Sequence, residues 1–156
     1  MRVRFYPAHS RRSSELYSCV MWAAADINTK EIIVSVTVAE LATFLARLLN
    51  PETVRIELQL GPERSSLHRF RAMRIELGDG CVRVNAQSDD VLLTGSREGF
   101  VELAEEVAAF ADYNDPDEPG MHAHFDPRVE QTRHGTLARD SAPLIIVGPI
   151  PDDGTT

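Results

Sequence analysis

Two stretches of the chain repeat apolar residues with the period of an α-helix, and each directly follows a short apolar stretch. Residues 38–49 place apolar side chains at i, i+3, i+4, i+7, i+10 and i+11, and residues 100–111 repeat that spacing. Such a pattern gathers the apolar side chains on one face of a helix, which must then pack against another layer. The preceding stretches, 32–36 and 91–94, are typical of buried strands. We therefore predict two units in which a strand leads into an amphipathic helix.

Both predicted helices begin at a recognisable cap. Thr37 with Glu40 three residues later forms a capping box, in which each side chain bonds a backbone amide of the first turn. Asn50-Pro51 should end the first helix. The segment GSREG, residues 95–99, is neither a nucleotide-binding loop nor a serine-hydrolase elbow. We interpret it as the turn that places Ser96 or a neighbouring residue at the N-cap of the second helix.

The rest of the chain contains several segments with the two-residue period of a strand. Apolar and polar residues alternate in 54–60 and 73–77, and Gly78-Asp79-Gly80 separates the latter from 81–84, which predicts a hairpin with a three-residue loop. Residues 144–147 predict a buried strand. Further strands are expected at 3–5 and 122–126, and the apolar run 16–25 fits either a strand or a helical segment.

These elements predict an α+β fold: a mostly antiparallel sheet of about six or seven strands, packed by two amphipathic helices. The length of 156 residues and the 43% hydrophobic content are ordinary for one compact domain. We expect that single domain to span residues 1–147. Residues 148–156, with two prolines and two aspartates, should form a flexible tail.

Charge is divided unequally along the chain. The formal net charge is -8, yet residues 1–80 carry 11 basic and 9 acidic side chains, whereas residues 81–156 carry 5 and 15. Between Glu98 and Asp126 there are nine carboxylates and no lysine or arginine. This balance argues against a protein that grips nucleic-acid phosphates directly.

The acidic block has two interpretations. It is either the solvated face of the second helix and its following loop, or a docking surface for a basic partner, because concentrated charge of one sign speeds encounter and selects partners. In the second case the candidate partner-binding residues are Glu102, Glu105, Glu106, Asp112, Asp115, Asp117, Glu118 and Asp126.

The segment HAHFD, residues 122–126, offers a different chemistry. Two histidines at i and i+2 of a strand leave the same face about 6.6 Å apart and are able to chelate one metal ion. Asp126 would lie about 13 Å from His122 on a straight strand, so a third ligand would have to come from His68, His134 or a distant carboxylate. A metal-dependent enzyme using His122 and His124 is therefore the alternative to a binding protein. Cys19 and Cys81 stand in separate apolar segments and form no paired thiolate motif.

No targeting or membrane segment is expected. The N-terminus is basic but lacks the apolar stretch of about 7–15 residues that a secretory signal needs. No run approaches the roughly 18 apolar residues of a membrane span. We expect a soluble, cytoplasmic protein without membrane association.

Three segments in order resemble a known family. They are LLTGSREGFVELAEEVAAFA (92–111), HAHFDP (122–127) and DSAPLIIV (140–147). Their sequence of strand, helix, HxH strand, loop and aliphatic strand is similar to the bacterial polymorphic-toxin immunity proteins of family 32. The resemblance extends over residues 32–147 and leaves residues 1–31 uncovered, and residues 127–139 depart from the family's pattern.

This resemblance implies a role without catalysis and without a cofactor. It implies an intracellular protein of α+β fold that binds a cognate bacterial toxin and blocks it. Many such toxins are basic nucleases, so an acidic surface could cover their active sites by imitating phosphates. Neutralising the acidic residues should then weaken toxin binding and flatten its dependence on salt.

Overall fold

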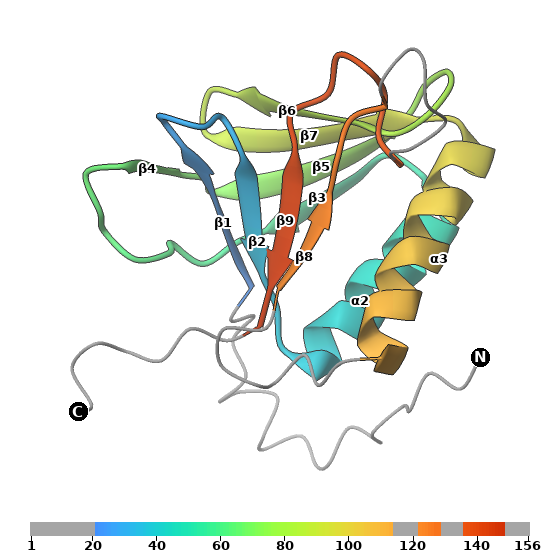
Figure 1. Ribbon diagram of the computed structural model, residues 1–156, viewed down its shortest axis with the longest axis horizontal. Coiled ribbons are helices and arrows are strands. Elements are labelled where there is room, and N and C mark those ends of the chain that lie inside the picture. The colour runs from blue at the N-terminus through green and yellow to red at the C-terminus, as the bar shows by residue number, and fades with distance from the viewer. Residues whose placement is uncertain (1–20, 114–121, 129–135, 149–156) are drawn as a thin grey trace.

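The computed structural model describes residues 21–113, 122–128 and 136–148 (Figure 1). The expected strand 3–5 and residues 149–156 of the expected tail lie outside these ranges. Within them the elements are β1 (Trp22–Asp26), β2 (Ile32–Ser35), α2 (Val38–Leu49), β3 (Val54–Glu57), β4 (Leu67–Arg69), β5 (Ala72–Leu77), β6 (Arg83–Gln87), β7 (Asp90–Gly95), α3 (Arg97–Tyr113), β8 (His122–Phe125) and β9 (Leu144–Val147).

The strands form two mixed sheets, which corrects the prediction of one sheet with six or seven strands. A five-stranded sheet has the order β4-β1-β2-β9-β8, and a four-stranded sheet has the order β3-β5-β7-β6. The pairs β2–β9 and β5–β7 are parallel, and the other described pairs are antiparallel. Figure 1 shows the strands of the two sheets crossing each other. The α+β class and the two helices are confirmed.

The predicted hairpin between residues 73–77 and 81–84 is wrong, because β7 lies between β5 and β6. Val91, Leu92 and Leu93 of β7 are all buried. A strand that is apolar on both faces stabilises a sheet most from an inner position. The half-exposed β6 therefore takes the edge, and β6 and β7 form the tight hairpin, in which Gln87 pairs with Asp90 and Ser88 adopts a φ of 53°.

Strands β1 and β4, in the first half of the chain, were not predicted as such by the sequence patterns. The end of the apolar run 16–25 forms strand β1, whose Ala23 and Ala24 are fully buried. The short strand β4 was not predicted; it pairs with β1 through three residues and lacks a clear alternation of its own.

Helix α2 begins and ends as predicted. The backbone amide of Glu40 donates to Thr37 Oγ1 over 3.3 Å, and the amide of Thr37 donates to a carboxylate oxygen of Glu40 over 3.0 Å. Asn50 is the C-cap. Two orphan amides of the first turn are thus satisfied.

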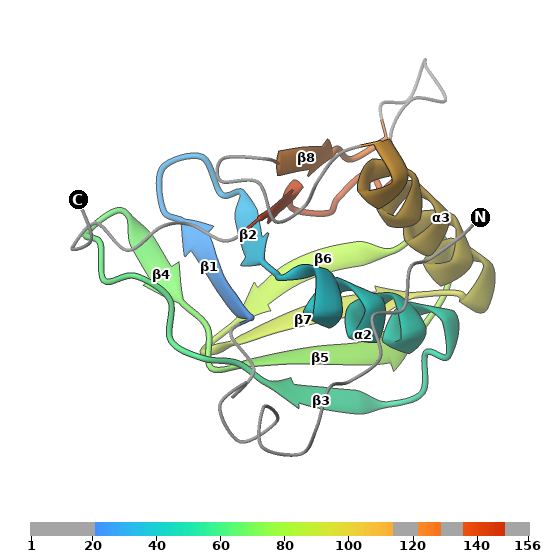
Figure 2. The same cartoon turned by 90° about the horizontal axis from the view of Figure 1, so that it is seen from below.

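The core is one cluster of buried side chains supplied by both sheets and both helices. Phe44 of α2, Phe70 before β5 and Phe100 of α3 are among its largest members. Helices α2 and α3 pack against each other and lie on one face of the four-stranded sheet, beside the five-stranded sheet (Figure 2). The opposite face of the four-stranded sheet carries polar side chains.

The segment 136–142 joins the two sheets before the chain enters β9. The amides of Ala138 and Ala142 donate to the carbonyls of Val82 and Val84 over 2.7 and 2.9 Å. Ser141 Oγ accepts the amide of Val84 over 2.8 Å. This segment therefore covers part of the edge of β6, which would otherwise expose unpaired backbone groups.

Candidate functional site

Helix α3 is fixed at its beginning by a close contact with the Gly78–Cys81 loop. Ser96 Oγ accepts the amide of Gly99 over 3.0 Å, which identifies Ser96, of the candidates at this turn, as the N-cap. The same hydroxyl donates to the carbonyl of Gly80 over 2.9 Å. A Cβ on Gly99 would lie 2.5 Å from the Gly80 carbonyl oxygen. Only glycine at position 99 lets the loop and the helix approach this closely.

One face of α3 is buried and the opposite face is acidic. Phe100, Leu103 and Val107 are fully buried on the core side. We define the acidic face of α3 as its exposed carboxylates, which are Glu98, Glu105, Glu106 and Asp112. The sequence therefore predicted correctly which side of this helix would meet solvent.

The distribution of charge along α3 is not the one that best stabilises a helix. Glu98 in the first turn suits the positive end of the helix dipole. The last turn contains Asp112 and no basic residue. An anion at that end opposes the dipole by about 0.3–1 kcal/mol at exposed positions. Helix stability thus gives no reason for an acid there.

The acidic block is partly neutralised by a residue just beyond it. Arg128 Nη2 donates to Glu102 Oε1 over 2.6 Å, and both side chains are partly exposed. Arg128 follows β8 by three residues, so this ion pair ties the end of that strand to α3. Glu102 is consequently the one candidate on α3 with an ion pair among the described residues.

The remaining candidate acids lie after α3. Asp126 is exposed directly after β8. Asp115, Asp117 and Glu118 lie outside the described residues. The structure thus places Glu102, Glu105, Glu106 and Asp112 on α3 and Asp126 beyond β8.

His122 and His124 lie on β8 with their side chains exposed on the same face, as the alternation predicts. Their ring centroids are 5.1 Å apart. Among residues 21–113, 122–128 and 136–148, no group of three or more histidine, cysteine or carboxylate side chains is arranged to hold a metal ion. His68, on β4, contacts the ring of Phe70 just after that strand and the carbonyl of Ser88 in the turn between β6 and β7. His134 lies outside the described residues.

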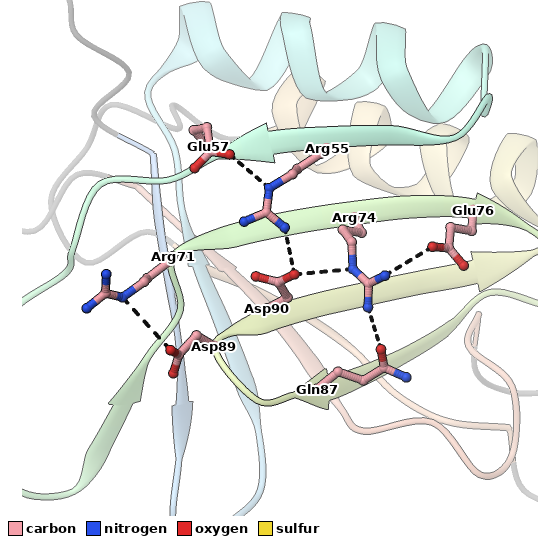
Figure 3. Close-up of polar contacts among 8 residues, drawn as sticks. All are labelled: Arg55, Glu57, Arg71, Arg74, Glu76, Gln87, Asp89 and Asp90. Carbon is pink, nitrogen blue, oxygen red and sulfur yellow. Dashed lines mark hydrogen bonds and ion pairs between the residues drawn. The ribbon is translucent and has the colours of Figure 1, made fainter.

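The polar face of the four-stranded sheet carries an ion network that the sequence patterns did not predict (Figure 3). Asp90 Oδ2 accepts from Arg55 Nη1 over 2.8 Å and lies 3.3 Å from Arg74 Nε. Hydrogen bonds to Glu57 and Asp90 raise the pKa of Arg55 above its ordinary value. The alternation of residues 54–60 and 73–77 predicted polar faces, but only strand register brings these groups together.

Within this network the positive charges of the arginines are paired with carboxylates. Further contacts join Arg74 to Glu76 and Gln87, and Arg71 to Asp89. Because each arginine faces a carboxylate, this surface presents no strong charge of either sign to a partner. We therefore assign it a structural role.

Comparison with known proteins concerns the C-terminal part of the chain. Residues 90–149 match the family model described as Immunity protein 32. This match spans β7, α3, β8 and β9 and confirms the resemblance over residues 90–147; residues 32–89 of the expected range lie outside it. No curated protein and no solved structure matches the chain.

The match covers 60 of the 156 residues and is a similarity of this part of the chain to immunity proteins. It includes the acidic face of α3 and the His122/His124 strand.

In the part of the chain that the structure describes, no helix is both long and apolar enough to cross a membrane.

Proposed function

We propose that this protein is an immunity protein that binds a cognate bacterial toxin in the cytoplasm and blocks it through the acidic face of α3. The observation that carries this proposal is that the matched region, residues 90–149, contains a helix with four exposed carboxylates on its outer face. Blocking a toxin requires a complementary surface and no chemistry of its own. We accordingly propose that the protein is not an enzyme.

The negative charge of the acidic face favours a basic partner. Glu105, Glu106 and Asp112 are exposed, and none of them forms an ion pair with another described residue. Acidic groups at such positions attract a basic partner over about a Debye length, which raises the rate of association at low salt. A nuclease that binds phosphates presents a basic active site, and we propose that class of toxin.

The candidate acids that follow α3 in the sequence belong to the same acidic stretch. Asp115, Asp117 and Glu118 follow the helix in sequence, and Asp126 is exposed after β8. The Arg128–Glu102 ion pair holds the end of β8 against α3. We propose that this contact keeps Asp126 on the same side of the molecule as the acidic face.

The test begins with a search of the neighbouring genes for a large toxin, whose C-terminal effector domain is then produced. Its affinity is measured for the unchanged protein and for the triple variant Glu105→Gln, Glu106→Gln, Asp112→Asn. Removing three attractive charges should weaken binding about tenfold or more and reduce the salt dependence of the association rate.

A matched control separates local from overall charge. The triple variant Glu52→Gln, Glu57→Gln, Glu63→Gln removes the same charge from exposed positions that lie outside α3 and outside the Gly78–Cys81 loop that contacts it. It should bind the toxin with unchanged affinity. Equal weakening by both variants, or no weakening by the α3 variant, would overturn the acidic face as the binding surface.

A further inference from the structure

His122 and His124 form a pair that the proposed toxin-binding role does not use. Both lie on β8, where Ala123 and Phe125 take the alternate positions and Phe125 is buried in the core. Antiparallel pairing with β9 sets His122 opposite Val147 and His124 opposite Ile145. The backbone of both histidines is thus held by a buried neighbouring strand, while both side chains are exposed.

The distance between the two ring centroids matches the distance expected for two imidazoles bound to the same metal ion. Metal–nitrogen bonds of about 2.0–2.1 Å and a tetrahedral ligand angle place two imidazole centroids about 5.2 Å apart. The centroids of His122 and His124 are 5.1 Å apart. The rings are now nearly perpendicular, at 79°. Because both side chains are exposed, turning the rings to aim one nitrogen of each at a common point requires no movement of the core.

We propose that His122 and His124 chelate one divalent transition-metal ion of the zinc type. Imidazole nitrogen suits zinc, copper and nickel, whereas magnesium and calcium prefer oxygen ligands. Only Ala123 separates the two ligands along a strand that pairing with β9 holds in place. Binding of the metal ion by the first ring therefore raises the effective concentration of the second ring around that ion.

The site supplies two protein ligands from the described residues and leaves the other coordination positions open. A closed structural zinc site takes four protein ligands. The open positions are filled by water or by a donor atom of another molecule. The site is therefore a surface chelate able to join a second molecule, and it does not depend on the acidic face of α3.

The experiment is calorimetric titration of the purified protein with Zn²⁺, with Mg²⁺ as the comparison ion. We expect binding of one Zn²⁺ per chain and no measurable binding of Mg²⁺. The single variants His122→Asn and His124→Asn should each weaken Zn²⁺ binding about tenfold or more, because either change removes the chelate. Circular dichroism and the thermal midpoint establish that each variant is folded.

His68→Asn is the matched control, since His68 is also exposed on a strand but has no histidine two residues away. It should leave Zn²⁺ affinity unchanged. NMR spectra of the imidazole protons should show the His122 and His124 resonances shifting together as Zn²⁺ is added. Absence of Zn²⁺ binding, or binding that either folded single variant retains in full, would overturn the proposal.

Discussion

At the scale of single residues, the polar face of the four-stranded sheet depends on one carboxylate. Arg55 and Arg74 are direct cross-strand partners, and like charges in that position repel. Asp90 lies between them from the neighbouring strand, with 19% of its side chain exposed. Its partly shielded position makes its contacts stronger than those of a fully exposed ion pair.

We predict that Asp90→Asn lowers the free energy of unfolding by about 1–2 kcal/mol, because it removes the carboxylate that separates two arginines. Urea denaturation at neutral pH measures this loss. Glu57→Gln removes the same charge from a side chain that is 75% exposed and contacts Arg55 alone; its effect should be clearly smaller. A loss for Asp90→Asn no larger than that of Glu57→Gln would contradict the shielded role of Asp90.

At the scale of elements, α3 and the Gly78–Cys81 loop pack with backbone against backbone. Gly99 lies in the first turn of α3, where an alanine would ordinarily favour the helix. Here a Cβ would meet the Gly80 carbonyl oxygen at 2.5 Å and the Cys81 Cα at 3.2 Å. The position of the acidic face relative to the sheet therefore depends on a residue without a side chain.

We predict that Gly99→Ala destabilises the protein by about 1–3 kcal/mol, since the loop must move away from the helix. The comparison is Gly78→Ala, where the nearest atom to a Cβ would be 3.7 Å away and the contact is ordinary. Thermal and urea unfolding of both variants distinguish them. Stabilisation by Gly99→Ala would show that helix propensity outweighs this contact.

At the scale of the whole molecule, the two sheets are connected by the segment 136–142 and by their shared core. Ser141 is buried; its Oγ accepts the amide of Val84 and also donates to the carbonyl of Ala142 over 2.8 Å. Arg83 pairs with Asp140 at 2.8 Å, and this hydrogen bond lowers the pKa of Asp140 below its ordinary value. The segment thus contacts β6 and the residue before it through backbone hydrogen bonds, through the Ser141 hydroxyl and through the Arg83–Asp140 ion pair.

We predict that Ser141→Ala lowers the free energy of unfolding by about 1–3 kcal/mol, because the amide of the buried Val84 loses its acceptor. Hydrogen exchange should show faster exchange of that amide in the variant. Ser65→Ala, at an exposed position, serves as the control and should change stability by less than about 0.5 kcal/mol. Unchanged protection of the Val84 amide would contradict this connection.

Periodicity and capping in the sequence determined the local elements that matter most to the site. The stripe of residues 100–111 predicted both the helix and its acidic outer side, and the alternation at 122–125 predicted two histidines on one face. Ser96 and the Thr37/Glu40 box marked where the helices begin. These features depend on residues within a few positions of each other, so the sequence alone carries the information.

The tertiary structure decided which distant segments lie side by side. It placed β7 between β5 and β6, divided the strands into two sheets, and brought Arg128 to Glu102 and Asp90 to Arg55. Strand order follows from which strands bury both faces, and ion pairs follow from the resulting register. These choices depend on competition among all strands for the inner positions of the sheets, which no local pattern encodes.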